Sequence, residues 1–138
     1  MKDCEVIVVG AGPAGIFAAL ELSRVASAEV LMIEKGYDLE RRKGPDPSLA
    51  SSVRGWGGAG AYSDGKLNLS SEVGGILSRF LSPGEVTGLI EEVDQTYLSF
   101  GGPTEAFGMD AGEVDRIGRE ARKYGLQLTP SRIRHLGT

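Results

Sequence analysis

The chain has few of the residue types that build disulfide frameworks and metal centres. Its 138 residues include one cysteine and one histidine, which excludes an internal disulfide, a CxxC pair and a zinc-ligand cluster. No apolar stretch approaches the length that a bilayer crossing requires. The formal net charge is −4, and the only basic run is Arg41-Arg42-Lys43, so we expect no nucleic-acid partner and no membrane partner. We also expect no signal peptide, and with the lone cysteine this predicts a cytoplasmic protein.

Glycine, by contrast, is abundant. The chain has 21 glycines, and most of the excess falls in the first turn, in residues 55–65 and in residues 101–112. Such clusters suit backbone that approaches a ligand closely or adopts positive φ angles. Trp56 and Tyr62 lie within the second cluster, and large aromatic side chains are usually anchored by burial. This cluster therefore favours a loop that wraps a ligand over a flexible linker.

The first glycine cluster stands between two apolar runs, residues 6–9 and 28–33. The pattern predicts a strand, a turn, a helix that begins between Gly12 and Gly15, and a second strand parallel to the first. This is the unit that cradles the pyrophosphate of a dinucleotide. Gly10 permits the sharp turn, Gly12 lets backbone approach the pyrophosphate, and Gly15 lets the helix pack closely on the strand. A glycine-rich turn in some other βαβ unit is the alternative.

Glu34 follows the second apolar run, at the predicted tip of the second strand. A carboxylate at this place can accept hydrogen bonds from both hydroxyls of an adenosine ribose, and its charge repels a 2′-phosphate. We therefore predict that Glu34 binds an unphosphorylated ribose. The second run, residues 28–33, is almost entirely apolar, which is typical of a parallel strand covered on both faces. A half-built sheet, by contrast, would leave an edge and apolar surface uncovered.

The rest of the chain predicts irregular structure and two helices. Residues 36–54 contain the breaker cluster Gly44-Pro45-Asp46-Pro47, and their basic run is either solvated or close to phosphates. Residues 76–81 predict a helical turn. Ser82, Pro83 and Glu85 predict a capped helix start, and that helix ends at Gly101. A second helix is predicted from Asp110 to Gly125, followed by a short strand over residues 126–128.

Four stretches together resemble the N-terminal part of a largely uncharacterised group of FAD-dependent dehydrogenases in the NAD(P)/FAD-dependent oxidoreductase family. They are residues 6–15, 34–36 and 57–67, the last with a Ser63-Asp64-Gly65-Lys66 core, and residues 134–138. Members of that family are several hundred residues long. The resemblance therefore predicts an N-terminal fragment that is inactive alone and holds FAD weakly or not at all.

The resemblance implies that Gly10, Gly12 and Gly15 hold the FAD pyrophosphate and that Glu34 holds the ribose. It further implies that residues 57–60 run along the cofactor, with Ser63, Asp64 and Lys66 toward the flavin. For Asp64 and Lys66, a turn acid and a solvated lysine are the alternative. Lys66 and His135, the single histidine, are the candidates for catalysis. The predicted cofactor-binding residues are Gly10, Gly12, Pro13, Ala14, Gly15, Glu34, Lys35, Arg42, Gly57, Gly58, Ala59, Gly60, Ser63, Asp64 and Lys66.

The predicted fold class is α/β: a Rossmann-like FAD/NAD(P)-binding βαβ unit with an inserted helical segment, in an incomplete domain. Residues 1–70 carry the βαβ unit and the glycine-rich loop, residues 71–128 the helical insertion, and residues 129–138 the start of a further segment. The predicted function is an FAD-dependent oxidoreductase acting on a small-molecule substrate by hydride transfer through flavin N5, with NAD(P)H as a candidate donor. The alternatives are an NAD-binding dehydrogenase domain and a non-catalytic nucleotide-binding or interaction module.

Overall fold

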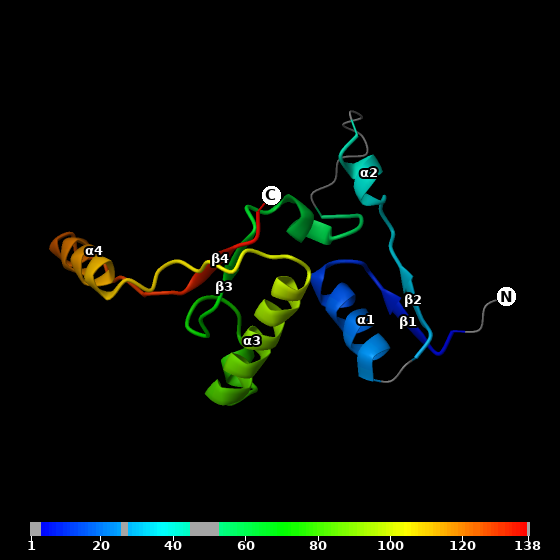
Figure 1. Ribbon diagram of the computed structural model, residues 1–138, viewed down its shortest axis with the longest axis horizontal. Coiled ribbons are helices and arrows are strands. Elements are labelled where there is room, and N and C mark those ends of the chain that lie inside the picture. The colour runs from blue at the N-terminus through cyan, green and yellow to red at the C-terminus, as the bar shows by residue number, and fades with distance from the viewer. Residues whose placement is uncertain (1–3, 26–27, 45–52, 138) are drawn as a thin grey trace. The chain divides into compact units, whose positions relative to one another are not determined.

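The protein has a mixed α/β fold, seen in a computed structural model that describes residues 4–25, 28–44 and 53–137 (Figure 1). The chain divides into two compact units, and the boundary lies between Ser63 and Asp64. The breaker residues 45–47 lie outside the described residues. Within the described part of the chain, none of the helices has the length and apolar character that a membrane crossing needs.

The first unit opens with the predicted βαβ arrangement. Strand β1 (Val6–Val9) and strand β2 (Val30–Ile33) are parallel neighbours in register, and helix α1 (Pro13–Val25) connects them. Pro13 is the first residue of α1, a position where its missing N–H costs little. The parallel pairing and the start of the helix are therefore as the glycine spacing predicts.

The two faces of this sheet differ. Side chains alternate along both strands between half-buried and exposed positions. Four large aliphatic residues share the exposed side: Ile7, Val9, Leu31 and Ile33, with Val9 81% exposed. The expectation that the strand over residues 28–33 is covered on both faces is therefore wrong for the described residues, and the uncovered apolar side is what a half-built sheet leaves. One helix on a two-stranded sheet covers only one face.

Two short elements follow β2 in the first unit. Helix α2 (Leu39–Arg42) begins after Asp38, whose Oδ1 accepts a hydrogen bond from the N–H of Arg41 at 2.8 Å. The prediction of irregular structure throughout residues 36–54 is therefore wrong at α2, because the Asp38 cap stabilises one helical turn. The glycine-rich loop ends in the 3₁₀ helix η1 (Gly58–Tyr62).

The second unit contains an antiparallel pair of strands and two longer helices. Strand β3 (Lys66–Asn68) pairs with strand β4 (Ile133–His135). Between them the chain forms the 3₁₀ helix η2 (Leu77–Arg79), helix α3 (Pro83–Ser99) and helix α4 (Ala111–Lys123).

The predicted starts of α3 and α4 are confirmed. Ser82 and Glu85 form a reciprocal capping box at the start of α3, and Asp110 caps α4 through the N–H of Glu113 at 2.8 Å. The strand predicted at residues 126–128 is wrong. These residues have no strand assignment, because the backbone that pairs with β3 lies further along the chain, in β4.

A buried ion pair organises the second unit. Arg134 of β4 is only 2% exposed, and its Nε and Nη2 donate to the carboxylate of Asp94 on α3 at 2.6 and 2.9 Å. Its Nη1 donates to the carbonyl oxygens of Pro103 and Glu105 at 2.7 and 3.2 Å. The guanidinium lowers the pKa of Asp94 through these hydrogen bonds. One side chain thereby connects α3, the segment that follows it, and β4.

Candidate functional site

The turn between β1 and α1 contains glycines with different structural requirements. Gly10 has a φ of 102°, and its N–H donates to the carbonyl oxygen of Ile33 at 2.7 Å. A Cβ added at Gly15 would overlap the carbonyl oxygen of Gly10, so close packing requires glycine there. A Cβ added at Gly12 would meet no described atom within 4 Å, and Gly12 has no positive φ. The fold explains Gly10 and Gly15 but leaves open space at Gly12.

The Glu34 carboxylate connects three backbone segments at the tip of β2. Its Oε2 accepts from the N–H of Ala11 at 2.7 Å, and its Oε1 accepts from Gly36 at 2.7 Å and Gly55 at 2.9 Å. Hydrogen bonds from these N–H groups, that of Ala11 first, lower the pKa of Glu34. A carboxylate has about four acceptor positions, and the N–H of Lys35 also lowers the pKa of Glu34, so backbone groups supply most of the donors that this carboxylate can accept from. Its binding of a ribose stays a prediction.

The glycine-rich loop, residues 55–62, lies directly on the first turn. The N–H of Gly57 donates to the carbonyl oxygen of Ala11 at 2.8 Å. A Cβ added at Gly58 would come within 3.1 Å of Gly12 Cα, and one added at Gly60 within 3.2 Å of Pro13 Cγ. Glycine at these places therefore permits the close approach. The structure brings together two glycine clusters that are far apart in the sequence.

Arg42 lies beneath this loop and is 3% exposed. Its Nη1 donates to the carbonyl oxygen of Trp56, and its Nη2 donates to that of Gly58 at 2.9 Å. The guanidinium carbon lies 4.6 Å from the ring centroid of Tyr62, whose hydroxyl donates to the carbonyl oxygen of Arg42 at 2.7 Å. From the sequence, Arg42 was interpreted as either solvated or close to phosphates. Its hydrogen bonds to the glycine-rich loop were not predicted.

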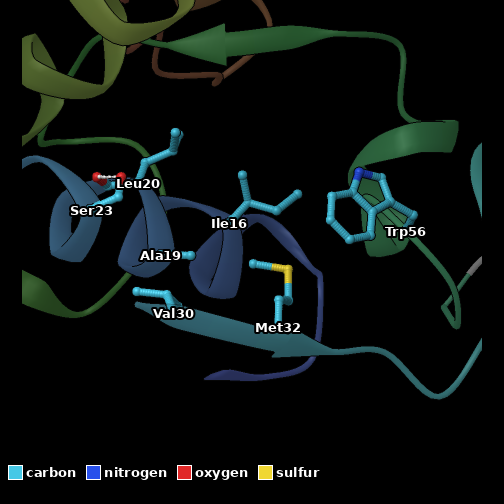
Figure 2. A pocket seen from close by; sticks show the side chains of 7 residues that line it. All are labelled: Ile16, Ala19, Leu20, Ser23, Val30, Met32 and Trp56. Atoms are coloured by element: carbon cyan, nitrogen blue, oxygen red, sulfur yellow. Dashed lines mark hydrogen bonds between the residues drawn. The ribbon is translucent and has the colours of Figure 1, made fainter. Parts of the chain in front are cut away.

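An apolar pocket of about 280 Å³ lies between α1 and β2 in the first unit (Figure 2). Trp56 lies at one end, near Ile16 and Met32, and Ser23 lies at the other end. The Ser23 hydroxyl donates its hydrogen bond to the carbonyl oxygen of Leu20 at 2.7 Å, so it has no hydrogen left to donate to a ligand. The pocket is suited to an apolar group. Its lining residues are Ile16, Ala19, Leu20, Ser23, Val30, Met32 and Trp56.

The predicted catalytic candidates lie together, but in the second unit. Lys66 of β3 is directly opposite His135 of β4, and its Nζ forms an exposed ion pair with Asp64 at 2.7 Å. The Lys66 hydrogen bond lowers the pKa of Asp64. The His135 ring makes an edge-on contact with Phe107, with 5.5 Å between centroids. Asp64, Lys66 and His135 thus form one exposed cluster on the β3–β4 ribbon.

Five further residues that were predicted to bind the cofactor lie at the surface of the first unit. Pro13, Ala14, Lys35, Ala59 and Ser63 are exposed. Within the described ranges, no three histidine, cysteine, aspartate or glutamate residues are grouped so that they could hold a metal ion.

Comparisons with known proteins give one partial match. A 70-residue alignment is 47% identical to a protein of Clostridium beijerinckii that bears the name "Uncharacterized protein". The alignment covers 44% of the chain and 13% of that protein, so the chain matches a small part of a much longer relative. No family model matches the chain, and no solved structure matches it.

Proposed function

We propose that the first unit is the Rossmann-like, nucleotide-binding part of an FAD-dependent oxidoreductase. The observation that carries the proposal is Gly12, which has open space at its Cβ and no positive φ, in the turn at the carboxyl end of β1. Ligands of parallel sheets bind at this edge. A glycine that the chain's own packing does not require suits backbone that a phosphate must approach closely.

The neighbouring groups fit the adenosine diphosphate half of such a cofactor. The first turn of α1 presents N–H groups at Ala14 and Gly15 without intrahelical partners, and the helix dipole favours an anion there. Glu34 lies at the tip of β2, and its carboxylate is held next to the first turn by the N–H of Ala11. Gly12, Ala14 and Gly15 would therefore hold the pyrophosphate, and Glu34 the ribose.

The glycine-rich loop favours FAD over NAD as the bound cofactor. A simple nicotinamide-binding domain has no place for such a loop on its first turn, and here Gly57 and Gly58 contact Ala11 and Gly12. When bound, FAD would supply hydride transfer through flavin N5 between a small-molecule substrate and an acceptor, with NAD(P)H as a candidate donor.

With a single cysteine in the chain, we assign the protein to the cytoplasm.

The most direct test uses ADP as the probe and Gly12→Ala as the variant. We expect ADP to bind the 138-residue chain weakly, because this chain supplies contacts to the adenosine diphosphate half of the cofactor only. ADP with an added 2′-phosphate should bind more weakly still, because Glu34 repels it. Gly12→Ala should abolish ADP binding while the unfolding midpoint stays unchanged. Both can be measured by calorimetric titration and thermal unfolding.

Two results would contradict the proposal. One is a wild-type chain that binds no ADP, and the other is a Gly12→Ala variant that binds ADP as the wild type does. The colour of the purified protein distinguishes FAD from NAD as the bound cofactor. A longer protein that contains this chain should be purified yellow, because bound FAD is coloured. A colourless longer protein that binds NAD would favour the NAD-dependent alternative.

A further inference from the structure

Arg42 is a buried cation that donates hydrogen bonds to two main-chain oxygens of the glycine-rich loop. We call Arg42, Trp56, Gly58 and Tyr62 the Arg42 cluster. The guanidinium donates to the carbonyls of Trp56 and Gly58, and the Tyr62 ring covers it at 4.6 Å. Burying a charge is costly unless it is hydrogen-bonded, and here the loop supplies the acceptors.

The bonding pattern uses a property that only arginine has. A guanidinium is planar and presents its N–H groups in a fixed fork, so two bonds from it fix the directions of both acceptors. The acceptors here are two carbonyls that flank Gly57. A lysine ammonium keeps the charge but lacks the fork. The orientation of the Gly57 peptide therefore depends on the shape of the Arg42 side chain as well as on its charge.

The orientation of this peptide matters because the loop contacts the candidate pyrophosphate site. Gly57 N–H donates to Ala11, and Gly58 lies against Gly12 Cα. Moving the loop would alter the space above the first glycine turn. An effect of Arg42 on nucleotide binding would then be transmitted by the loop.

We propose that Arg42 is a positioning residue that holds the glycine-rich loop against the first glycine turn, and so shapes the site for the diphosphate of a nucleotide. This inference rests on the proposed nucleotide-binding function. The alternative is that Arg42 contacts phosphate directly, and the experiment below distinguishes the two.

The test compares Arg42→Lys and Arg42→Gln with Arg41→Gln as the matched control. Arg41 has the same charge, is the neighbouring residue and is exposed. Trp56 is the single tryptophan of the chain and belongs to the Arg42 cluster, so its fluorescence reports the loop without any ligand. ADP affinity is measured by titration, and far-UV circular dichroism checks that each variant is folded.

We expect both Arg42 variants to shift Trp56 emission to longer wavelength in the ligand-free protein. Both should weaken ADP binding about tenfold or more, the effect of losing hydrogen bonds to a charged group. Lysine should perform no better than glutamine, since it lacks the fork. Arg41→Gln should change neither the emission nor the affinity.

Different outcomes overturn the inference and the proposed function. If Trp56 emission is unchanged, Arg42→Lys keeps most of the ADP affinity and Arg42→Gln loses it, Arg42 contacts phosphate directly and the inference fails. If both Arg42 variants bind ADP as the wild type does, it also fails. If the wild-type chain itself binds no ADP, the proposed nucleotide-binding function is wrong, and the inference that rests on it is wrong as well.

A milder variant decides the matter should both Arg42 variants fail to fold. Tyr62→Phe keeps the ring over the guanidinium and removes only the 2.7 Å bond from the hydroxyl to the Arg42 carbonyl. We expect a smaller shift of Trp56 emission in the same direction and a smaller loss of ADP affinity. No shift and no loss in this variant would overturn the inference.

Discussion

At the scale of single residues, two glycines of one turn are expected to respond differently to the same substitution. Gly15→Ala places a methyl group on the carbonyl oxygen of Gly10, whereas Gly12→Ala places one in open space. Overpacking typically costs about 1–3 kcal/mol. Gly15→Ala should therefore lower the free energy of unfolding by an amount in this range or above it. Gly12→Ala should leave it unchanged. Urea unfolding measures both, and equal stabilities for the two variants would contradict this account of the turn.

Glu34 gives a pH-dependent prediction at the same scale. Its pKa is lowered by backbone N–H groups of Ala11, Gly36 and Gly55, so its stabilising effect is fully present above the unfolded-state pKa of about 4.3. This effect is lost as the pH falls through the lower folded-state pKa. Trp56 emission should therefore shift to longer wavelength on acidification. Glu34→Gln should show the shifted emission already at neutral pH, whereas Glu21→Gln, on the exposed surface, should behave as the wild type does.

At the scale of elements, the capping box gives α3 a defined start. Ser82 Oγ accepts from the N–H of Glu85, and the Glu85 carboxylate accepts from the N–H of Ser82 at 2.8 Å. Ser82→Ala removes one half of this exchange and should destabilise the second unit by about 1 kcal/mol. Ser82→Thr keeps the acceptor and should cost less. Thermal unfolding compares the two, and equal losses would show that the cap is not the cause.

The elements also show which parts of the structure a sequence can predict. The starts of α1, α3 and α4 were predicted because each depends on residues within one turn: Pro13, the Ser82–Glu85 box, and Asp110. Strand β4 was missed because its partner β3 is remote in sequence. Its residues, among them Arg134 and His135, carry no apolar pattern that predicts a strand.

In the candidate site, too, features that depend on neighbouring residues were predicted, and contacts between segments remote in sequence were not. The glycine turn and the position of Glu34 were predictable from spacing within one βαβ unit. The bonds from Glu34 to Gly55 and from Arg42 to Trp56 were not. Each joins segments separated by a stretch without periodic pattern, and an arginine in a basic run gives no sign that it will be buried. The contacts that hold the glycine-rich loop in place therefore required the structure.

At the scale of the whole molecule, two compact units predict two separable unfolding responses. The Asp94–Arg134 pair lies in the second unit, and Trp56 lies in the first. Breaking a buried pair by removing one partner typically costs about 3–5 kcal/mol, which for a unit of this size lowers the unfolding midpoint by roughly 10 °C or more. Asp94→Ala should thus move the circular dichroism transition of α3 and α4 to lower temperature. Trp56 emission should keep its wild-type transition, because Trp56 belongs to the other compact unit. A shift of both signals together would show instead that the two units unfold as one cooperative structure.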